Sequence, residues 1–364
     1  MWPTGPDGCP LLGSGLPPAG RCPECAIFAG DSVQFQAGAN SDRNSRIHLI
    51  WGERHASPKR SSSDAFGPPA RAASLWHAEY AAASGWSPAR RIFVQSGERD
   101  GLLWNSESAA SVVARSGRIQ LAVPRVHGAL LHLTYDADAW RVDSIPARAL
   151  YATIAEASDG ALYMAYVGAD RENESTPGTI LLSRAATSGG AWSEPRRIGA
   201  SRSGGATRLR LLIGSRAVLH LLWSVSESGP LTTSAVRYVA SENGGRTWSG
   251  RTDLPLPHEP FTKWRVAVDR CGSPHVLVST WTRHGTISLG RVLHSSMSVH
   301  GWTPLTPLQL GTSAREIAVD SDAAGTIYLV ASVDTSAARG ERPAYGVVVS
   351  RFGDRDAVTA SASR

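Results

Sequence analysis

The chain has 364 residues, of which 42% are hydrophobic, and it carries a formal net charge of +6. A chain of this length can bury a large core, and because no run of 18 apolar residues occurs we expect no membrane-spanning helix. The basic residues are almost all arginines, and they are scattered without forming a basic helix, so nucleic-acid binding is not expected.

The first 30 residues differ from the rest in composition, because they are rich in Pro and Gly and contain three of the four cysteines. They are predicted to form a flexible head, and they lack the charged and apolar regions of a secretory signal. Cys22 and Cys25 have CxxC spacing, but Cys9 and the distant Cys271 are the remaining cysteines. A zinc site is therefore not predicted, nor is any other metal or cofactor. A disulfide-linked head is the alternative if the protein is exported.

Residues 31–355 are predicted to form one domain, followed by a disordered tail at 356–364. Five tryptophans recur in this domain at intervals of 52 to 56 residues, which is typical of a repeat architecture. They are Trp86, Trp140, Trp192, Trp248 and Trp302. Each follows a turn of small residues, where the indole can pack back over the turn and hold two strands together.

Upstream of each turn the chain has a strand, a small turn and a strongly apolar strand, as in residues 118–135 and 151–167. Alternation within these runs is typical of half-buried strands. Four short strands per period, without a helical pattern, predict an all-β fold: a β-propeller with four antiparallel strands in each blade. Counting gives six blades, with five or seven left open. The sixth begins at Arg315, and its missing strand is expected from residues 31–38.

Other polar residues in this region are expected to have structural roles. Residues 55–74 are predicted to be an exposed loop of the first blade. Histidines within apolar strands are expected to be hydrogen-bonded core residues; these are His48, His132, His220 and His275. Asp269 and Asp320 occupy equivalent places in two repeats, and we expect both to cap turns.

Residues 241–248 resemble the Asp-box of the sialidase (neuraminidase) superfamily, Ser-x-Asp-x-Gly-x-Thr-Trp. Ser241, Gly245, Thr247 and Trp248 match this motif, and Asn243 stands where the family has Asp. The resemblance implies a six-bladed propeller and favours export from the cell. Asp-boxes lie in turns away from the family's active site, so they imply a fold and not an activity.

The resemblance also implies catalytic positions. Sialidases hold the substrate carboxylate with three arginines, and they use an Asp acid/base and a Tyr nucleophile assisted by a Glu. The positions similar to these catalytic groups are Asp64, Tyr345 and Glu259. Those similar to the three arginines are Arg46, Arg283 and Arg315, with Arg291 as the alternative to Arg315. The family's first arginine lies in Phe/Tyr-Arg-Ile-Pro, which is absent here, so efficient sialoside cleavage is not expected.

Three functions remain open at this point. The preferred one is a propeller that recognises a glycan or a protein on one ring face without strong hydrolytic activity. The alternatives are an exo-glycosidase of the sialidase type and a structural scaffold. An enzyme needs titratable groups that converge in one concavity, whereas a binding protein needs only aromatic and polar groups on an open rim. The protein is expected to be monomeric.

Overall fold

The computed structural model describes most of the strand-forming chain. The described residues are 37–41, 47–53, 71–72, 74–81, 84–94, 102–103, 110–113, 118–125, 128–136, 139–169, 177–187, 189–199, 205–226, 235–257, 261–284, 287–298, 300–308, 313–321, 327–334 and 345–352. The predicted head, the tail and the loop at 55–70 lie outside them.

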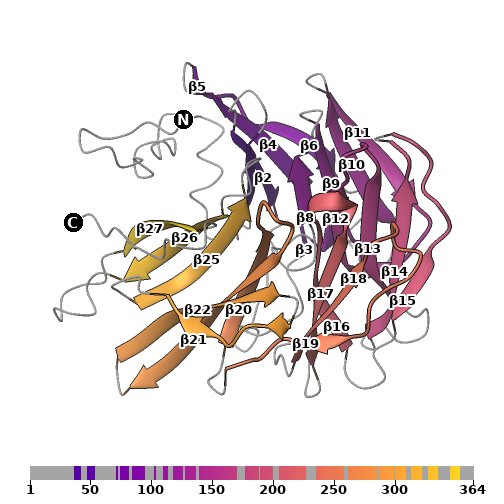
Figure 1. The fold of residues 1–364 in the computed structure, drawn as a ribbon. Helices are drawn as coiled ribbons and strands as arrows, with labels where there is room; N and C mark the ends of the chain where they lie inside the picture. Colours follow the sequence, from indigo (N-terminus) through magenta and orange to yellow (C-terminus); the bar gives the residue numbers. More distant parts are fainter. Residues whose placement is uncertain are drawn as a thin grey trace. The chain divides into compact units, whose positions relative to one another are not determined.

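The chain divides into two compact units, one of residues 1–211 with 226–230 and one of residues 212–225 with 231–364. Three antiparallel sheets belong to the first unit (Figure 1). The first sheet contains β1 (Ala37–Ser41), β2 (Ile47–Glu53), β4 (Ser74–Ala81), β5 (Gly85–Trp86) and β6 (Arg90–Val94). The second contains β8 (Ala110–Val113), β9 (Ile119–Val123), β10 (Leu130–Asp136) and β11 (Ala139–Ile145). The third contains β12 (Ala149–Glu156), β13 (Leu162–Ala169), β14 (Pro177–Ala185) and β15 (Arg196–Gly199).

The boundary between the units falls in the fourth sheet, and the fifth and sixth sheets belong to the second unit. The fourth sheet contains β16 (Gly205–Ile213), β17 (Leu219–Ser226), β18 (Ala235–Ser241) and β19 (Thr252–Asp253). The fifth contains β20 (Phe261–Val268), β21 (Pro274–His284), β22 (Ile287–Ser298), β23 (Gly301–Trp302) and β24 (Thr306–Pro307). The sixth contains β25 (Ser313–Ser321), β26 (Ile327–Asp334) and β27 (Tyr345–Phe352). A small separate pair joins β3 (Arg71–Ala72) to β7 (Leu102–Leu103).

The predicted all-β class is therefore confirmed. Among the described residues the helical structure is one 3-10 turn at Ser215–Ala217. None of the described helical structure has the length and apolarity that a membrane crossing requires. Strands follow one another in chain order across each sheet, which is the arrangement expected for propeller blades.

The second sheet places residues 118–135 differently from the matching segment of the third sheet. They form its second and third strands, because β8 precedes them at the edge of the sheet. Residues 151–167 lie in the first and second strands of the third sheet. The apolar run Leu130–Tyr135 leads directly into the turn before Trp140, with no further strand between them. Trp140 thereby keeps the same place as the other tryptophans, after the third strand.

The expected origin of the sixth sheet's missing strand is also revised. Of residues 31–38, the structure describes Ala37 and Gly38, and these pair with Trp51 and Ile50 in the first sheet. They belong to β1, the first strand of that sheet. The described part of the sixth sheet has three strands.

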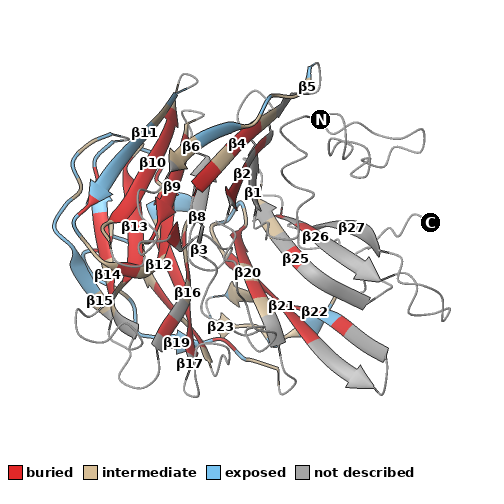
Figure 2. Cartoon of the chain, turned by 180° about the vertical axis from the view of Figure 1, so that it is seen from behind, coloured by how far each residue is buried: buried red, intermediate tan, exposed pale blue. Residues whose placement is uncertain are grey.

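The core consists of apolar layers between consecutive sheets. Ile50 and Leu75 of the first sheet pack with Leu121 and Leu133 of the second. Similar clusters join the second sheet to the third, the fourth to the fifth, and the fifth to the sixth. Figure 2 shows that β9, β10 and β13 are buried along most of their length, whereas β11 is largely exposed. These four pairs of consecutive sheets thus bury apolar faces against each other, as stacked repeats do.

Candidate functional site

A repeated hydrogen-bond pattern closes the turn around four of the five tryptophans. The residue after each Trp has a hydroxyl that accepts a backbone N–H from the third strand, and its own N–H returns to the carbonyl of that same strand residue. The hydroxyl contacts are Ser87 to Glu79 (3.0 Å), Ser193 to Arg184 (3.0 Å), Ser249 to Ala240 (2.9 Å) and Thr303 to Ser296 (2.9 Å). These Trp turns therefore use one geometry, which the period of the tryptophans reflects.

The turn at residues 241–248 carries additional side-chain bonds. The Ser241 hydroxyl accepts the N–H of Gly245 at 2.9 Å, and Asn243 Oδ1 accepts the N–H of Thr247 at 2.9 Å. The Asn243 side-chain amide also donates to the Thr247 hydroxyl at 2.7 Å. An asparagine can fill this position because its carbonyl accepts as a carboxylate would, and its NH₂ group adds a donor.

Four sheets contain a polar pair that joins the second strand to the third diagonally, and it is buried in three of them and half-buried in the fifth sheet. The pairs are His48 with His77 (3.0 Å), Gln120 with His132 (2.7 Å), His220 with Tyr238 (2.9 Å) and His275 with His294 (2.9 Å). In the third sheet the equivalent Tyr163 accepts a bond from Arg184 Nε at 3.2 Å. The expectation that the strand histidines are hydrogen-bonded is confirmed for all four that were named; His48, His132 and His220 are buried, whereas His275 is half-buried.

The tryptophans extend these pairs from one sheet to the next. Their rings lie edge-on against the third-strand member of the preceding sheet's pair. The ring centroids are 5.3 Å apart for Trp140 on His77, 5.1 Å for Trp192 on His132 and 5.3 Å for Trp302 on Tyr238. The indole therefore does more than hold its own turn, because it also covers the polar pair of the sheet before it.

Burial keeps most of these histidines neutral. Desolvation lowers the pKa of His132 to about 4, although Asp143 acts in the opposite direction. Desolvation also lowers the pKa of His220 to about 4, against the opposing effects of the Gly272 backbone and Asp269. The pKa of His294 is lowered to about 4 by desolvation and by its neighbour His275.

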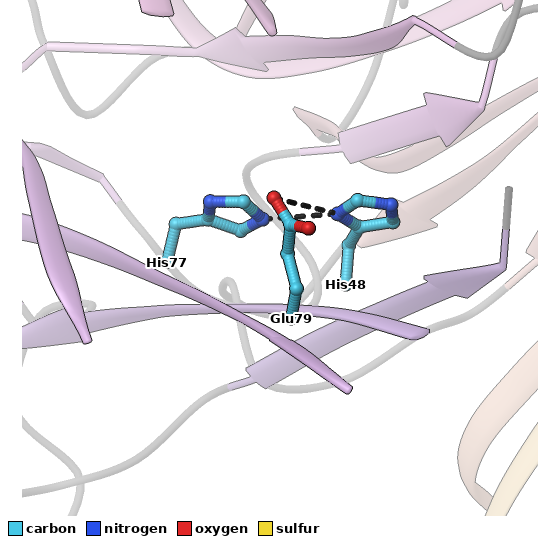
Figure 3. Close-up of side chains that lie close together, drawn as sticks. All are labelled: His48, His77 and Glu79. Atoms are coloured by element: carbon cyan, nitrogen blue, oxygen red, sulfur yellow. Dashed lines mark hydrogen bonds and ion pairs between the residues drawn. The ribbon is translucent and has the colours of Figure 1, made fainter. Parts of the chain in front are cut away.

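The first sheet brings two imidazoles and a carboxylate together (Figure 3). His48 comes from β2, and His77 and Glu79 come from β4. One ligand atom from each of the three lies within 4.8 Å of the others. His48 and His77 are 0% and 2% exposed, and the Glu79 side chain is 18% exposed. The Tyr135 hydroxyl of the second sheet donates to Glu79 Oε1. This cluster was not predicted from the sequence.

The fifth sheet has a similar set of residues arranged differently. His275 Nδ1 lies 2.9 Å from His294 Nε2, but Asp269 Oδ2 lies 3.3 Å from the other ring nitrogen of His275. Asp269 also accepts the N–H of Ser273 at 2.7 Å, so its expected capping role is confirmed. The carboxylate and the second imidazole thus lie on opposite sides of His275 and do not converge.

The residues expected for catalysis are only partly within the described chain. Arg46, Asp64 and Glu259 lie outside it. Arg283 lies near the end of β21, opposite Ser288, and Arg315 lies at a bulge near the start of β25. Tyr345 begins β27 and pairs with Asp334. The strand pairing places the backbones of Arg283, Arg315 and Tyr345 at one end of their sheets. This is the end opposite the turn that joins the first strand of each sheet to the second. The alternative residue, Arg291, lies within β22 opposite Thr280 and is exposed.

No family model matches the sequence, and no curated protein matches it. The fold is similar to that of several solved structures. A protein of unknown function from Dyadobacter fermentans DSM 18053 superimposes with a TM-score of 0.56 at 10% identity, covering 86% of this chain and 94% of that one. The NanB sialidase from Streptococcus pneumoniae gives 0.52 at 11% identity, covering 82% of this chain and 65% of that one. AofleA from Arthrobotrys oligospora gives 0.50 at 11% identity, covering 88% and 84%. The chain is thus similar in fold to a sialidase propeller.

Proposed function

We propose that this chain is a six-bladed β-propeller that recognises an acidic glycan at the sheet ends opposite the Trp turns, without strong hydrolytic activity. The observation that carries the proposal is the likeness in fold to the NanB sialidase, which extends over 82% of this chain. The six sheets, the apolar packing between four pairs of consecutive sheets and the bonds within residues 241–248 support the same reading.

Three backbone positions support that choice of sheet end. Arg315 and Tyr345 lie in the same sheet, two strands apart, which corresponds to about 10 Å at the usual spacing of strands. Arg283 lies in the neighbouring sheet, and the fifth and sixth sheets pack together through Leu277 and Ile317. Arginine binds a carboxylate with two parallel hydrogen bonds, so these positions favour a sugar that bears a carboxylate.

Weak hydrolysis is proposed because the segment at the first arginine position differs from the family motif. In Arg46-Ile47-His48, the histidine replaces the family's proline and is buried in β2 against His77. This supports a packing role for the segment. A missing carboxylate-binding arginine would leave the substrate weakly held.

Binding of sialyllactose to the purified chain tests the proposal. Arg283→Ala and Arg315→Ala should each weaken binding by more than about 10-fold, since each removes a charge-assisted pair. Arg246→Ala is the matched control, because Arg246 is exposed in a Trp turn at the other sheet end. Equal loss in all three variants would point to general charge attraction and would overturn the placement of the site.

The alternative is an exo-glycosidase of the sialidase type with Tyr345 as nucleophile. The position of Tyr345 beside Asp334, in the same sheet as Arg315, supports this alternative. A fluorogenic sialoside assay separates the two functions. Turnover that disappears in Tyr345→Phe would support the enzyme. If the chain neither binds sialyllactose nor cleaves the fluorogenic sialoside, the scaffold function remains.

A further inference from the structure

We propose that His48, His77 and Glu79 form a binding site for a divalent transition metal, with zinc as the representative ion. Nδ1 of His48, Nε2 of His77 and Oε1 of Glu79 are the ligand atoms. Two imidazoles and one carboxylate suit zinc and similar ions, whereas calcium and magnesium prefer oxygen donors. With three protein ligands, a water molecule would have to complete the four-coordinate geometry of zinc.

The distance between the two imidazole nitrogens suits a bound ion, whereas the Glu79 carboxylate would have to move closer. Two nitrogens bound to one tetrahedral zinc ion lie about 3.3 Å apart, and those of His48 and His77 are 3.0 Å apart. Glu79 Oε1 lies 4.0 Å from His48 Nδ1 and would have to move closer by roughly half an ångström. The Tyr135 hydroxyl donates to this carboxylate and orients it, as groups around metal ligands commonly do.

Glu79 distinguishes this sheet from the others. In each of the six described sheets one third-strand residue pairs with the His, Gln or Tyr of the second strand. These residues are Glu79, Thr134, Arg184, Ala240, Ser296 and Arg351. Glu79 is the one carboxylate among them. The His275–His294 pair has the same two imidazoles, but its carboxylate, Asp269, approaches from the far side. The His275–His294 pair is therefore a natural control within the same chain.

Trp140 disfavours metal binding, because it determines which ring nitrogen of His77 carries the proton. The indole N–H is a donor only, and it points at His77 Nδ1 at 3.3 Å. Neutral His77 then carries its proton on Nε2 and donates it to His48 Nδ1. An ion bound between His77 Nε2 and His48 Nδ1 would take the place of that proton. The proton would then have to move to Nδ1 of His77, where it would face the indole N–H of Trp140. Removing the indole N–H should therefore strengthen metal binding.

The test is titration of the full chain with Zn²⁺ and Co²⁺, followed by calorimetry and visible absorption. We expect one ion per chain at this site. The Co²⁺ spectrum should lack a thiolate charge-transfer band, which separates the site from Cys9, Cys22 and Cys25. Glu79→Gln should weaken binding by more than about 100-fold, beyond the effect of changing a surrounding group. His294→Gln should leave affinity unchanged.

Trp140→Phe keeps an aromatic ring in place and should bind the metal more tightly than the parent chain, a result that misfolding cannot produce. Near-ultraviolet circular dichroism checks the fold of every variant. Binding that persists in Glu79→Gln, binding with a thiolate band alone, or no binding by the folded parent chain would each overturn the site.

Discussion

Acid should destabilise this protein at pH values well above those at which carboxylates ordinarily titrate. His132, His220 and His294 have a pKa of about 4 in the folded chain, against an ordinary value of 6.5. The unfolded chain therefore binds protons that the folded chain excludes. The stabilisation is fully present above pH 6.5 and is lost as the pH falls towards 4.

The size of the effect follows from these values. Each histidine should lose about 2 kcal/mol of stabilisation between pH 7 and pH 5, so the three together lose about 5–6 kcal/mol. That loss is comparable with the whole stability of many domains. His275, whose pKa is also lowered by burial, acts in the same direction. Asp and Glu titrate mainly below this window.

Urea unfolding followed by tryptophan fluorescence at constant ionic strength between pH 7.5 and 5 measures this loss. His132→Gln removes one titrating group and should reduce the pH dependence by about 2 kcal/mol over the same range, whatever its effect on stability at pH 7. A free energy of unfolding that changes by less than about 1 kcal/mol between pH 7 and 5 would refute the reasoning. So would an unchanged pH dependence in the variant.

Three further substitutions test the packing by denaturant unfolding. Trp302→Ala should cost about 2–3 kcal/mol, because the half-buried indole packs on the fourth and fifth sheets, and Trp302→Phe should cost less; equal costs would contradict a packing role. Ser249→Ala should cost about 1 kcal/mol through the lost bond to the Ala240 N–H, whereas Ser249→Thr should be tolerated. Gly272→Ala should cost at least about 2 kcal/mol, since Gly272 has φ +85 and an added Cβ would press on Ser215; a neutral result would contradict the strained turn.

The repeat and its strand content could be predicted because four of the five tryptophans mark turns of one geometry. The place of residues 118–135 within their sheet could not be predicted, because a strand-turn-strand pattern is the same for strands one and two as for strands two and three. Only pairing with β8 distinguishes these registers.

The contacts of the tryptophans could not be predicted, since Trp140 meets His77 from 63 residues earlier and no local pattern specifies that partner. The cluster of His48, His77 and Glu79 was missed for a similar reason. Its members lie on two strands separated by a long insertion, and their proximity depends on strand register. The signal in the sequence that could have indicated the cluster was a glutamate, Glu79, in a strand otherwise rich in buried residues. The positions inferred from the sialidase resemblance remain predictions.

Trp140, Trp192 and Trp302 each contact the preceding sheet, so that part of a sheet's packing is completed only when the next repeat has been synthesised. A sheet leaves the ribosome with its polar pair uncovered, and the ring that covers the pair belongs to the next repeat. At usual translation rates that repeat takes about 3–10 s to appear. Until then His77, His132 and Tyr238 lack their aromatic cover. A chain stalled between two tryptophans should therefore leave its last complete sheet the most open to hydrogen exchange.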